Sequence, residues 1–260
     1  MLFRKNQGSK VAATVDGSTV VGAGLSSLLL FWMPVIRTHR FDANRRFEDL
    51  PVRLPHEALK SELNSSPMPL EALTRAVAEG DLPERYLQHP AVVAAAPGDS
   101  IHPFCLYMDG VSFTRNDSIL AFWIYFLFTG CRHLVFVAKK SELCKCGCRG
   151  WCTLYSIWRM LAWSFSVMLS GIHPATKPNG EPWDDGSDQA AAAGTPLGFR
   201  ALCLLVKADW AEFAGTMAFP GWADAISPCP LCRCTREMLY QLRGFSALDM
   251  PCAAKTLADY

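Results

Sequence analysis

The stretch CKCGCRGWC at residues 144–152 constrains this chain more than any other feature of its 260 residues. Four thiols in nine positions call for either disulfides or a metal ion, and thiols this close in sequence do not pair easily with each other. The total of eleven cysteines is odd, and no clear secretory signal accompanies them, which disfavours a disulfide framework. We therefore expect bound zinc, because closely spaced cysteines can direct several thiolates at one tetrahedral centre.

A second group of cysteines, C-x2-C-x-C, lies at residues 229–234. The first four thiols can form an all-thiolate site alone, or some of them can share one ion with the later three. C-x-C-x-C crowding is hard to aim at a single tetrahedral centre, so the shared arrangement is favoured. In either case the site is expected to be closed and structural. The candidate zinc ligands are Cys144, Cys146, Cys148, Cys152, Cys229, Cys232 and Cys234.

Basic residues surround the first cysteine group, although the formal net charge of the whole chain is only +1. They can contact nucleic-acid phosphates. They can equally form a solvated face around a stabilising zinc clip, which is the favoured alternative. The candidate nucleic-acid contacts are Lys139, Lys140, Lys145 and Arg149.

The N-terminal region, residues 1–100, combines an apolar stretch with helical patterns. Thr19 to Ile36 contains 18 residues without a charge, which meets the lower length limit for a transmembrane helix. Basic residues on both sides leave its orientation unreadable. A buried segment broken at Gly22, Gly24 and Pro34 is the favoured alternative. The stretches PHEALKSEL and PLEALTRAVAEG have apolar residues at helical spacing and predict two short helices.

Residues 101–219 alternate between strand-like and helical patterns. HPFCLYMDGVSF, SILAFWIYFLFT and RHLVFVAKK predict three strands of an antiparallel meander, the first interrupted at Asp109-Gly110. After the cysteine cluster, residues 151–171 predict a buried apolar helix that ends at Gly171. ALCLLV at 201–206 predicts a strand buried on both faces, and AEFAGTM predicts a further helix. The tryptophans of this region are expected in the core. The fold class is therefore α/β (α+β).

Two aspartates stand out in this order, Asp109 on the first strand and Asp209 just after the fourth. Taken separately, each is typical of a turn or a helix N-cap. If the two strands are parallel neighbours, however, their carboxylates lie close together and repel each other unless a cation lies between them. Oxygen ligands suit Mg²⁺ or Mn²⁺, and two such ions can hold a phosphodiester for in-line attack.

With LYMDG at 106–110 and LLVKADWAE at 204–212, residues 101–219 resemble the core of RNase H-like nucleases and DDE-type transposases. The segments CGCRGW and DWAEF are similar to those of cysteine-rich, mobile-element-derived reading frames of protists. The resemblance implies an RNase H-like mixed sheet with flanking helices over residues 101–260, a zinc-binding insertion at 141–152 and a second cysteine-rich segment at 228–235. It implies Asp109 and Asp209 as the first members of an acidic triad, with Glu212 our choice for the third over Asp224, Glu237 and Asp249.

The implied function is metal-dependent DNA strand transfer or cleavage in the nucleus, or a degenerate, truncated relic of it without a partner. Two alternatives remain open. One is a non-catalytic zinc module that binds nucleic acid or protein. The other is a membrane protein anchored by residues 19–36.

Overall fold

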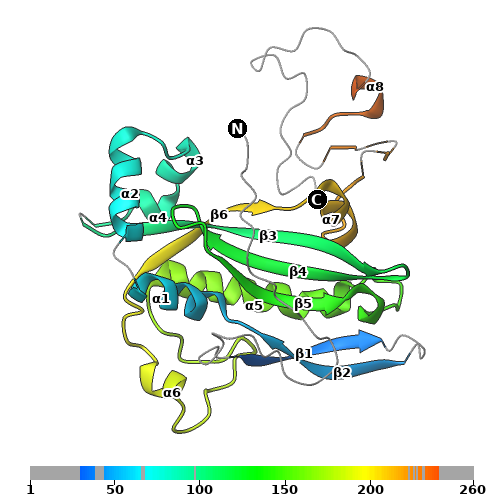
Figure 1. Ribbon diagram of the computed structural model, residues 1–260, viewed down its shortest axis with the longest axis horizontal. Coiled ribbons are helices and arrows are strands. Elements are labelled where there is room, and N and C mark those ends of the chain that lie inside the picture. The colour runs from blue at the N-terminus through cyan, green and yellow to red at the C-terminus, as the bar shows by residue number, and fades with distance from the viewer. Residues whose placement is uncertain are drawn as a thin grey trace.

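The computed structural model describes residues 30–38, 44–65, 68–96 and 98–221, and residues 223–239 with gaps. Within these residues the chain forms six strands and several helices (Figure 1). In chain order they are β1 (Phe31–Thr38), β2 (Arg45–Val52), α1 (Pro55–Ser65), α2 (Met68–Glu79), α3 (Glu84–Leu87), α4 (Pro90–Val93), β3 (Ile101–Thr114), β4 (Asp117–Phe126), β5 (Arg132–Lys139), the 3-10 helix η1 (Lys140–Glu142), α5 (Trp151–Ser170), α6 (Asp188–Ala192), β6 (Arg200–Lys207), α7 (Trp210–Thr216) and α8 (Arg236–Leu239).

A mixed four-stranded sheet of order β5-β4-β3-β6 forms the centre of the fold. β3, β4 and β5 make the predicted antiparallel meander, and β6 runs parallel to β3 as its other neighbour. The order strand, strand, strand, helix, strand, helix is therefore confirmed. β3 is not interrupted at Asp109-Gly110, because both residues stay paired with β4 in an unbroken register.

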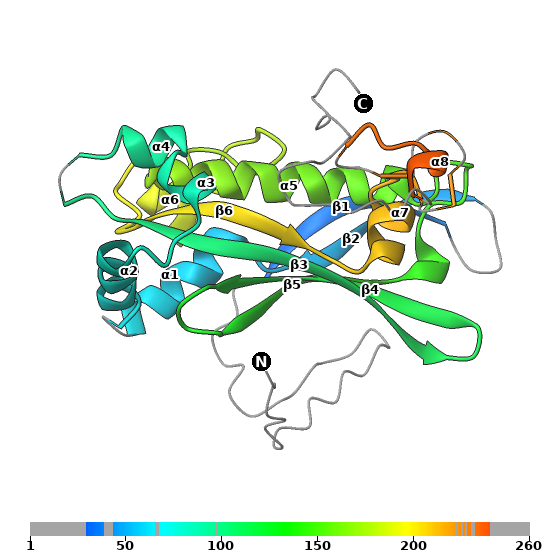
Figure 2. The same ribbon diagram turned by 90° about the horizontal axis from the view of Figure 1, so that it is seen from above.

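Helix α5 packs along one face of this sheet (Figure 2). Its buried residues include Leu154, Ile157 and Met168, and they share one core with even-numbered residues of β3 such as Phe104 and Leu106. The helix ends at Gly171, which adopts the left-handed conformation (φ 72°) that favours glycine at this position. The predicted buried helix is therefore confirmed, and burial of its apolar face is its main source of stability.

Part of the apolar run at 19–36 forms a strand. Residues 19–29 lie outside the described residues, whereas Phe31–Thr38 is β1 and pairs antiparallel with β2. Met33 and Val35 are buried in the core that α5 also lines. In the part of the chain that the structure describes, no helix has the length and apolar character to cross a membrane.

The N-terminal helices pack into two separate hydrophobic clusters. α1 contributes Ala58 and Leu59 to the main cluster, and α2–α4 form a second cluster with the start of β3 and β6. β6 lies at the edge of the four-stranded sheet and Val206 is 40% exposed. The prediction that this strand is buried on both faces is therefore wrong for its C-terminal half.

Candidate functional site

Four thiols converge in the loop that leads from η1 into α5. The Sγ atoms of Cys144, Cys146, Cys148 and Cys152 all lie within 4.8 Å of one another, and those of Cys146 and Cys152 are 3.7 Å apart. A tetrahedral ion with zinc–sulfur bonds of about 2.3 Å separates its sulfurs by about 3.8 Å. The donor set therefore fits a closed, structural zinc site with no position left for a substrate.

The local backbone explains how so short a segment reaches one centre. Three residues between the cysteines have positive φ, namely Gly147 at 96°, Arg149 at 53° and Gly150 at 86°. These left-handed conformations form the turns that separate neighbouring cysteines. For Arg149 this conformation costs about 1–2 kcal/mol. The sequence offers no sign of it, which is why the crowded spacing wrongly favoured ligands from elsewhere.

Hydrogen bonds fix the loop between β1 and the first turn of α5. The backbone N–H of Cys144 donates to Thr153 Oγ1 at 2.9 Å, and that hydroxyl donates to the carbonyl of Ile36. The backbone N–H of Lys145 donates to Thr38 Oγ1 at 3.1 Å. Zinc bound here would tie β1, the loop and α5 together, so its binding energy would contribute to the stability of the whole core.

The thiols also interact with one another and with the helix N-terminus. Burial opposes ionisation of Cys148, but hydrogen bonds from the Cys152 backbone N–H and from the neighbouring thiols lower its pKa to about 6. The pKa of Cys152 is raised to about 12, with its hydrogen bond to Cys148 the largest cause. Arg45 lies 3.8 Å from Cys152 Sγ and places a cation beside the cluster.

The later cysteines do not join this group. Among the described residues, the four thiols of 144–152 are the one set of three or more possible metal ligands whose donor atoms converge. Cys229, Cys232 and Cys234 are described but lie outside it. The structure therefore does not form the site shared between the two cysteine groups, which the sequence favoured. It agrees with the alternative in which the first four cysteines form a site alone.

The predicted basic residues lie beside the zinc loop in two different settings. Lys139 pairs with Glu142 at 3.6 Å and Lys140 pairs with Glu212 at 2.5 Å. Lys145 and Arg149 are exposed and have no ion pair within the described part of the chain. Three of the four, Lys140, Lys145 and Arg149, line a hollow of about 460 Å³ between the zinc loop and α7.

The two aspartates lie at the same end of the β3–β6 pair. Tyr107 is paired with Lys207 in the parallel register. Asp109 and Asp209 each lie two residues further along their chains. Tyr107 hydroxyl donates to Asp109 Oδ2 at 3.0 Å. Burial, that hydrogen bond and the charge of Asp109 raise the pKa of Tyr107, with a smaller contribution from the charge of Asp209 and an opposing one from Arg132.

Each aspartate keeps one carboxylate oxygen available. Asp209 is the N-cap of α7, and its Oδ1 accepts from the Glu212 backbone N–H at 2.7 Å. Among the described residues, Asp109 Oδ1 and Asp209 Oδ2 accept no hydrogen bond. The N-cap interpretation of Asp209 is thus confirmed without excluding a second role for its free oxygen.

Glu212 does not join the two aspartates. Its side chain is buried, with the residue 3% exposed, and its carboxylate accepts from Lys140 Nζ at 2.5 Å and from Thr216 Oγ1 at 2.6 Å. A Cβ at residue 110 would collide with Glu212 Oε1, which explains the glycine there. Because successive side chains of a strand point to opposite faces, Glu212 lies on the α5 face of β3 and Asp109 lies on the other.

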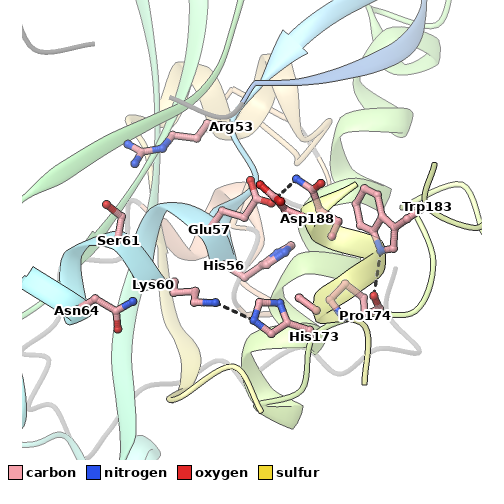
Figure 3. A pocket seen from close by; sticks show the side chains of 12 residues that line it. Arg53, His56, Glu57, Lys60, Ser61, Asn64, His173, Pro174, Trp183 and Asp188 are labelled. Carbon is pink, nitrogen blue, oxygen red and sulfur yellow. Dashed lines mark hydrogen bonds between the residues drawn. The ribbon is translucent and has the colours of Figure 1, made fainter. Parts of the chain in front are cut away.

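A second hollow, of about 330 Å³, lies between α1 and the segment around α6 (Figure 3). Lys60 Nζ lies 2.8 Å from His173 Nε2, and Gln189 donates to Glu57 Oε1 at 3.3 Å. His56 is buried, and its Nδ1 lies 2.8 Å from Ser164 Oγ on α5. The sequence carries no motif for this group, because its members come from separate segments, and its side chains largely satisfy one another.

The buried imidazole of His56 makes stability depend on pH. Burial, followed by the charges of His173 and Lys60, lowers its pKa from 6.5 to about 3, so the unfolded chain binds the proton more tightly. Stability is therefore intact above pH 6.5 and falls as the pH decreases toward 3. We expect His56 alone to remove about 2 kcal/mol between pH 7 and pH 5.

Urea unfolding of the zinc-loaded protein at pH 7 and pH 5 measures this effect. His56→Asn keeps a polar group for Ser164 and is expected to lose about 2 kcal/mol less than the native chain over that interval. An equal loss in both proteins would contradict a neutral, buried His56.

Comparison of the chain with protein-family models, curated protein sequences and solved structures finds no match. The function must therefore be inferred from the two groups of residues described above, the thiols that can hold zinc and the carboxylates of Asp109 within β3 and Asp209 just after β6.

Proposed function

We propose that this chain is a nucleic-acid-processing domain of the RNase H-like, transposase type, stabilised by zinc at Cys144, Cys146, Cys148 and Cys152. One observation carries the proposal, the parallel pairing of β3 with β6 in the order β5-β4-β3-β6. With this pairing Asp109, within β3, and Asp209, two residues after the end of β6, follow the paired residues Tyr107 and Lys207, although they lie 100 positions apart in the sequence. A helix crossing between an antiparallel meander and a parallel fourth strand is also the arrangement that such a core requires.

In this function the two carboxylates hold a divalent cation between them. Asp109 Oδ1 and Asp209 Oδ2 would be the ligand atoms, because the other oxygen of each carboxylate is fixed by Tyr107 or by the start of α7. Mg²⁺ or Mn²⁺, when bound, would supply charge stabilisation for attack on a phosphodiester by water or a 3′-hydroxyl. Tyr107 and the α7 N-terminus would orient the carboxylates.

A second candidate is a zinc module that binds nucleic acid without cleaving it. The engagement of Glu212 by Lys140 and Thr216 favours it, because this acid is then not available as a third metal ligand. The hollow lined by Lys140, Lys145 and Arg149 offers cations for phosphate contact in either candidate.

A cleavage assay separates the two candidates. The full chain, loaded with zinc, is incubated with supercoiled plasmid and with labelled duplex DNA in the presence of Mg²⁺ or Mn²⁺. Nicking or strand transfer that requires the added cation supports the first candidate. DNA binding without any cation-dependent cleavage overturns it and leaves the binding module.

Phosphate contact by the zinc loop predicts a change in salt dependence. Each phosphate that a cation neutralises on duplex DNA contributes about −0.9 to the slope of log K against log salt. Replacing Lys145 and Arg149 together by alanine is therefore expected to reduce the magnitude of the slope by about 1.8. The affinity should fall similarly for unrelated DNA sequences, because phosphate contacts carry no sequence information.

The matched control removes two exposed arginines from the opposite end of the sheet, Arg75→Ala with Arg85→Ala. Fluorescence anisotropy at several salt concentrations gives the slope for each protein. If the control reduces the slope as much as the zinc-loop variant, the charges act through the whole surface and the zinc loop is not the contact.

A further inference from the structure

The face of the four-stranded sheet that points away from α5 carries aromatic and basic side chains. Phe104 and Phe122 contact Phe165 and Trp158 of α5 edge-on, so the alternate residues of β3 and β4 point the other way. These include Tyr107, Trp123 and Tyr125. Trp123 therefore lies outside the buried core, in contrast to the expectation for the tryptophans of this region.

The strand register aligns these residues in two rows across the sheet. In the first row Leu134, Trp123, Tyr107 and Lys207 are successive partners on β5, β4, β3 and β6. In the second row Arg132 on β5 is level with Tyr125 on β4. The rings occupy the two central strands, and cations occupy both outer strands.

The contacts within the rows hold the aromatic side chains in place. The rings of Tyr107 and Trp123 are 5.6 Å apart at 35°, and Lys207 Nζ lies 6.0 Å from the centre of the Tyr125 ring. Tyr107, Trp123 and Tyr125 are partly exposed, and Arg132 and Lys207 are exposed. Leu134, at the end of the first row, is 45% exposed.

We propose that this open face, defined by Tyr107, Trp123, Tyr125, Arg132 and Lys207, binds single-stranded nucleic acid. Bases stack on aromatic side chains because every base has a π-face, and cations beside the rings attract the phosphates. Sheet faces with two or three exposed aromatic residues are an established way to hold unpaired bases. An interface with a second protein is the alternative, and the test below separates the two.

The open face continues into the pair of aspartates. Asp109 lies two residues beyond Tyr107 on the same side of β3, and the Tyr107 hydroxyl donates to it. A strand held on the rings would pass its backbone beside Asp109 and Asp209. Only the path of the strand past the two aspartates rests on the proposed function. The binding of a single strand can be tested without any cleavage.

The test uses the full chain loaded with zinc and a fluorescein-labelled oligothymidylate, with a blunt duplex of equal length as the comparison. Stacking of one base predicts that Trp123→Leu weakens single-strand binding about 5- to 100-fold. Duplex binding should change less than about twofold, because paired bases cannot stack on the sheet. Trp123→Phe keeps a ring and should restore most of the affinity.

Trp32→Leu is the matched control, since Trp32 is 59% exposed on β1, outside this sheet. The proposal is overturned if Trp123→Leu leaves single-strand affinity unchanged while the native chain binds the oligonucleotide, or if the native chain does not bind it. It is also overturned if the variant only changes a dimer into a monomer, which would identify the face as a contact between copies.

The outcome is separable from that of the proposed function. Asp109→Asn with Asp209→Asn should abolish cation-dependent cleavage and retain single-strand binding. Cation-dependent cleavage by a chain whose single-strand affinity is unaffected by Trp123→Leu would overturn the open face and leave the aspartates. Single-strand binding that depends on Trp123, in a protein that never cleaves DNA, would support the open face and overturn the catalytic role of the aspartates.

Discussion

Replacing Cys144 by serine is expected to lower the midpoint of thermal unfolding of the zinc-loaded protein by at least about 10 °C. A structural zinc site contributes about 10–16 kcal/mol in small metal-dependent folds, and a whole domain is stable by only about 5–15 kcal/mol. Cys144 is 2% exposed and its loop is bonded to β1 and α5. Loss of one thiolate therefore releases the contacts between the loop, β1 and the start of α5 together.

Circular dichroism during heating, with zinc measured on the same samples, checks this expectation. Cys131→Ser is the matched control, because Cys131 is an exposed thiol outside the group of four, and it should change stability by no more than about 0.5 kcal/mol. A strong zinc chelator should reproduce the effect in the native chain. An unchanged midpoint and zinc content in Cys144→Ser would refute the four-thiol site.

Replacing Asp109 or Asp209 by asparagine is expected to reduce cation-dependent cleavage about 1,000-fold. Charge stabilisation by a catalytic ion supplies several kcal/mol to the transition state, and each 1.36 kcal/mol is a factor of about ten in rate. Asparagine is as good an N-cap as aspartate, so Asp209→Asn should preserve α7 and remove only the charge. The unfolding midpoint should therefore stay within a few degrees of the native value.

Single-turnover cleavage of labelled duplex DNA at saturating Mn²⁺ gives the rates. Asp185→Asn, at an exposed aspartate between α5 and α6, is the matched control and should cleave at the native rate. Equal activity in all three variants would show that any cleavage arises elsewhere on the chain.

The sequence was sufficient to predict the sheet and its helix but not the geometry of the zinc loop. The apolar runs of β3–β6 and the long apolar pattern of α5 are local signals, whereas the parallel β3–β6 pair was only a condition of the sequence argument and is seen in the structure. Arg149 has its positive φ in a loop that hydrogen bonds of Cys144 and Lys145 hold to α5 and β1, and no local signal in the sequence indicates it. β2, with the sequence RRFEDLPV, lacks a strand pattern and becomes a strand only through pairing with β1.

The acid site shows the same division between local and distant signals. Asp109 lies in one recognisable strand pattern and Asp209 follows another, and their shared location depends on the parallel pairing of the two strands. The carboxylate of Glu212 could not be placed this way. Its direction depends on Lys140, which comes from η1 on the far side of β3 and β4, and on the space above Gly110.

The most direct test of the central claim is Mn²⁺ binding by the zinc-loaded chain, measured from the electron paramagnetic resonance signal of the free ion. If one cation lies between Asp109 and Asp209, each single asparagine variant should bind Mn²⁺ at least about tenfold more weakly. The double variant should bind Mn²⁺ no more tightly than either single one, because the two carboxylates contact the same ion. Native Mn²⁺ affinity in either single variant would show that no cation bridges the two strands.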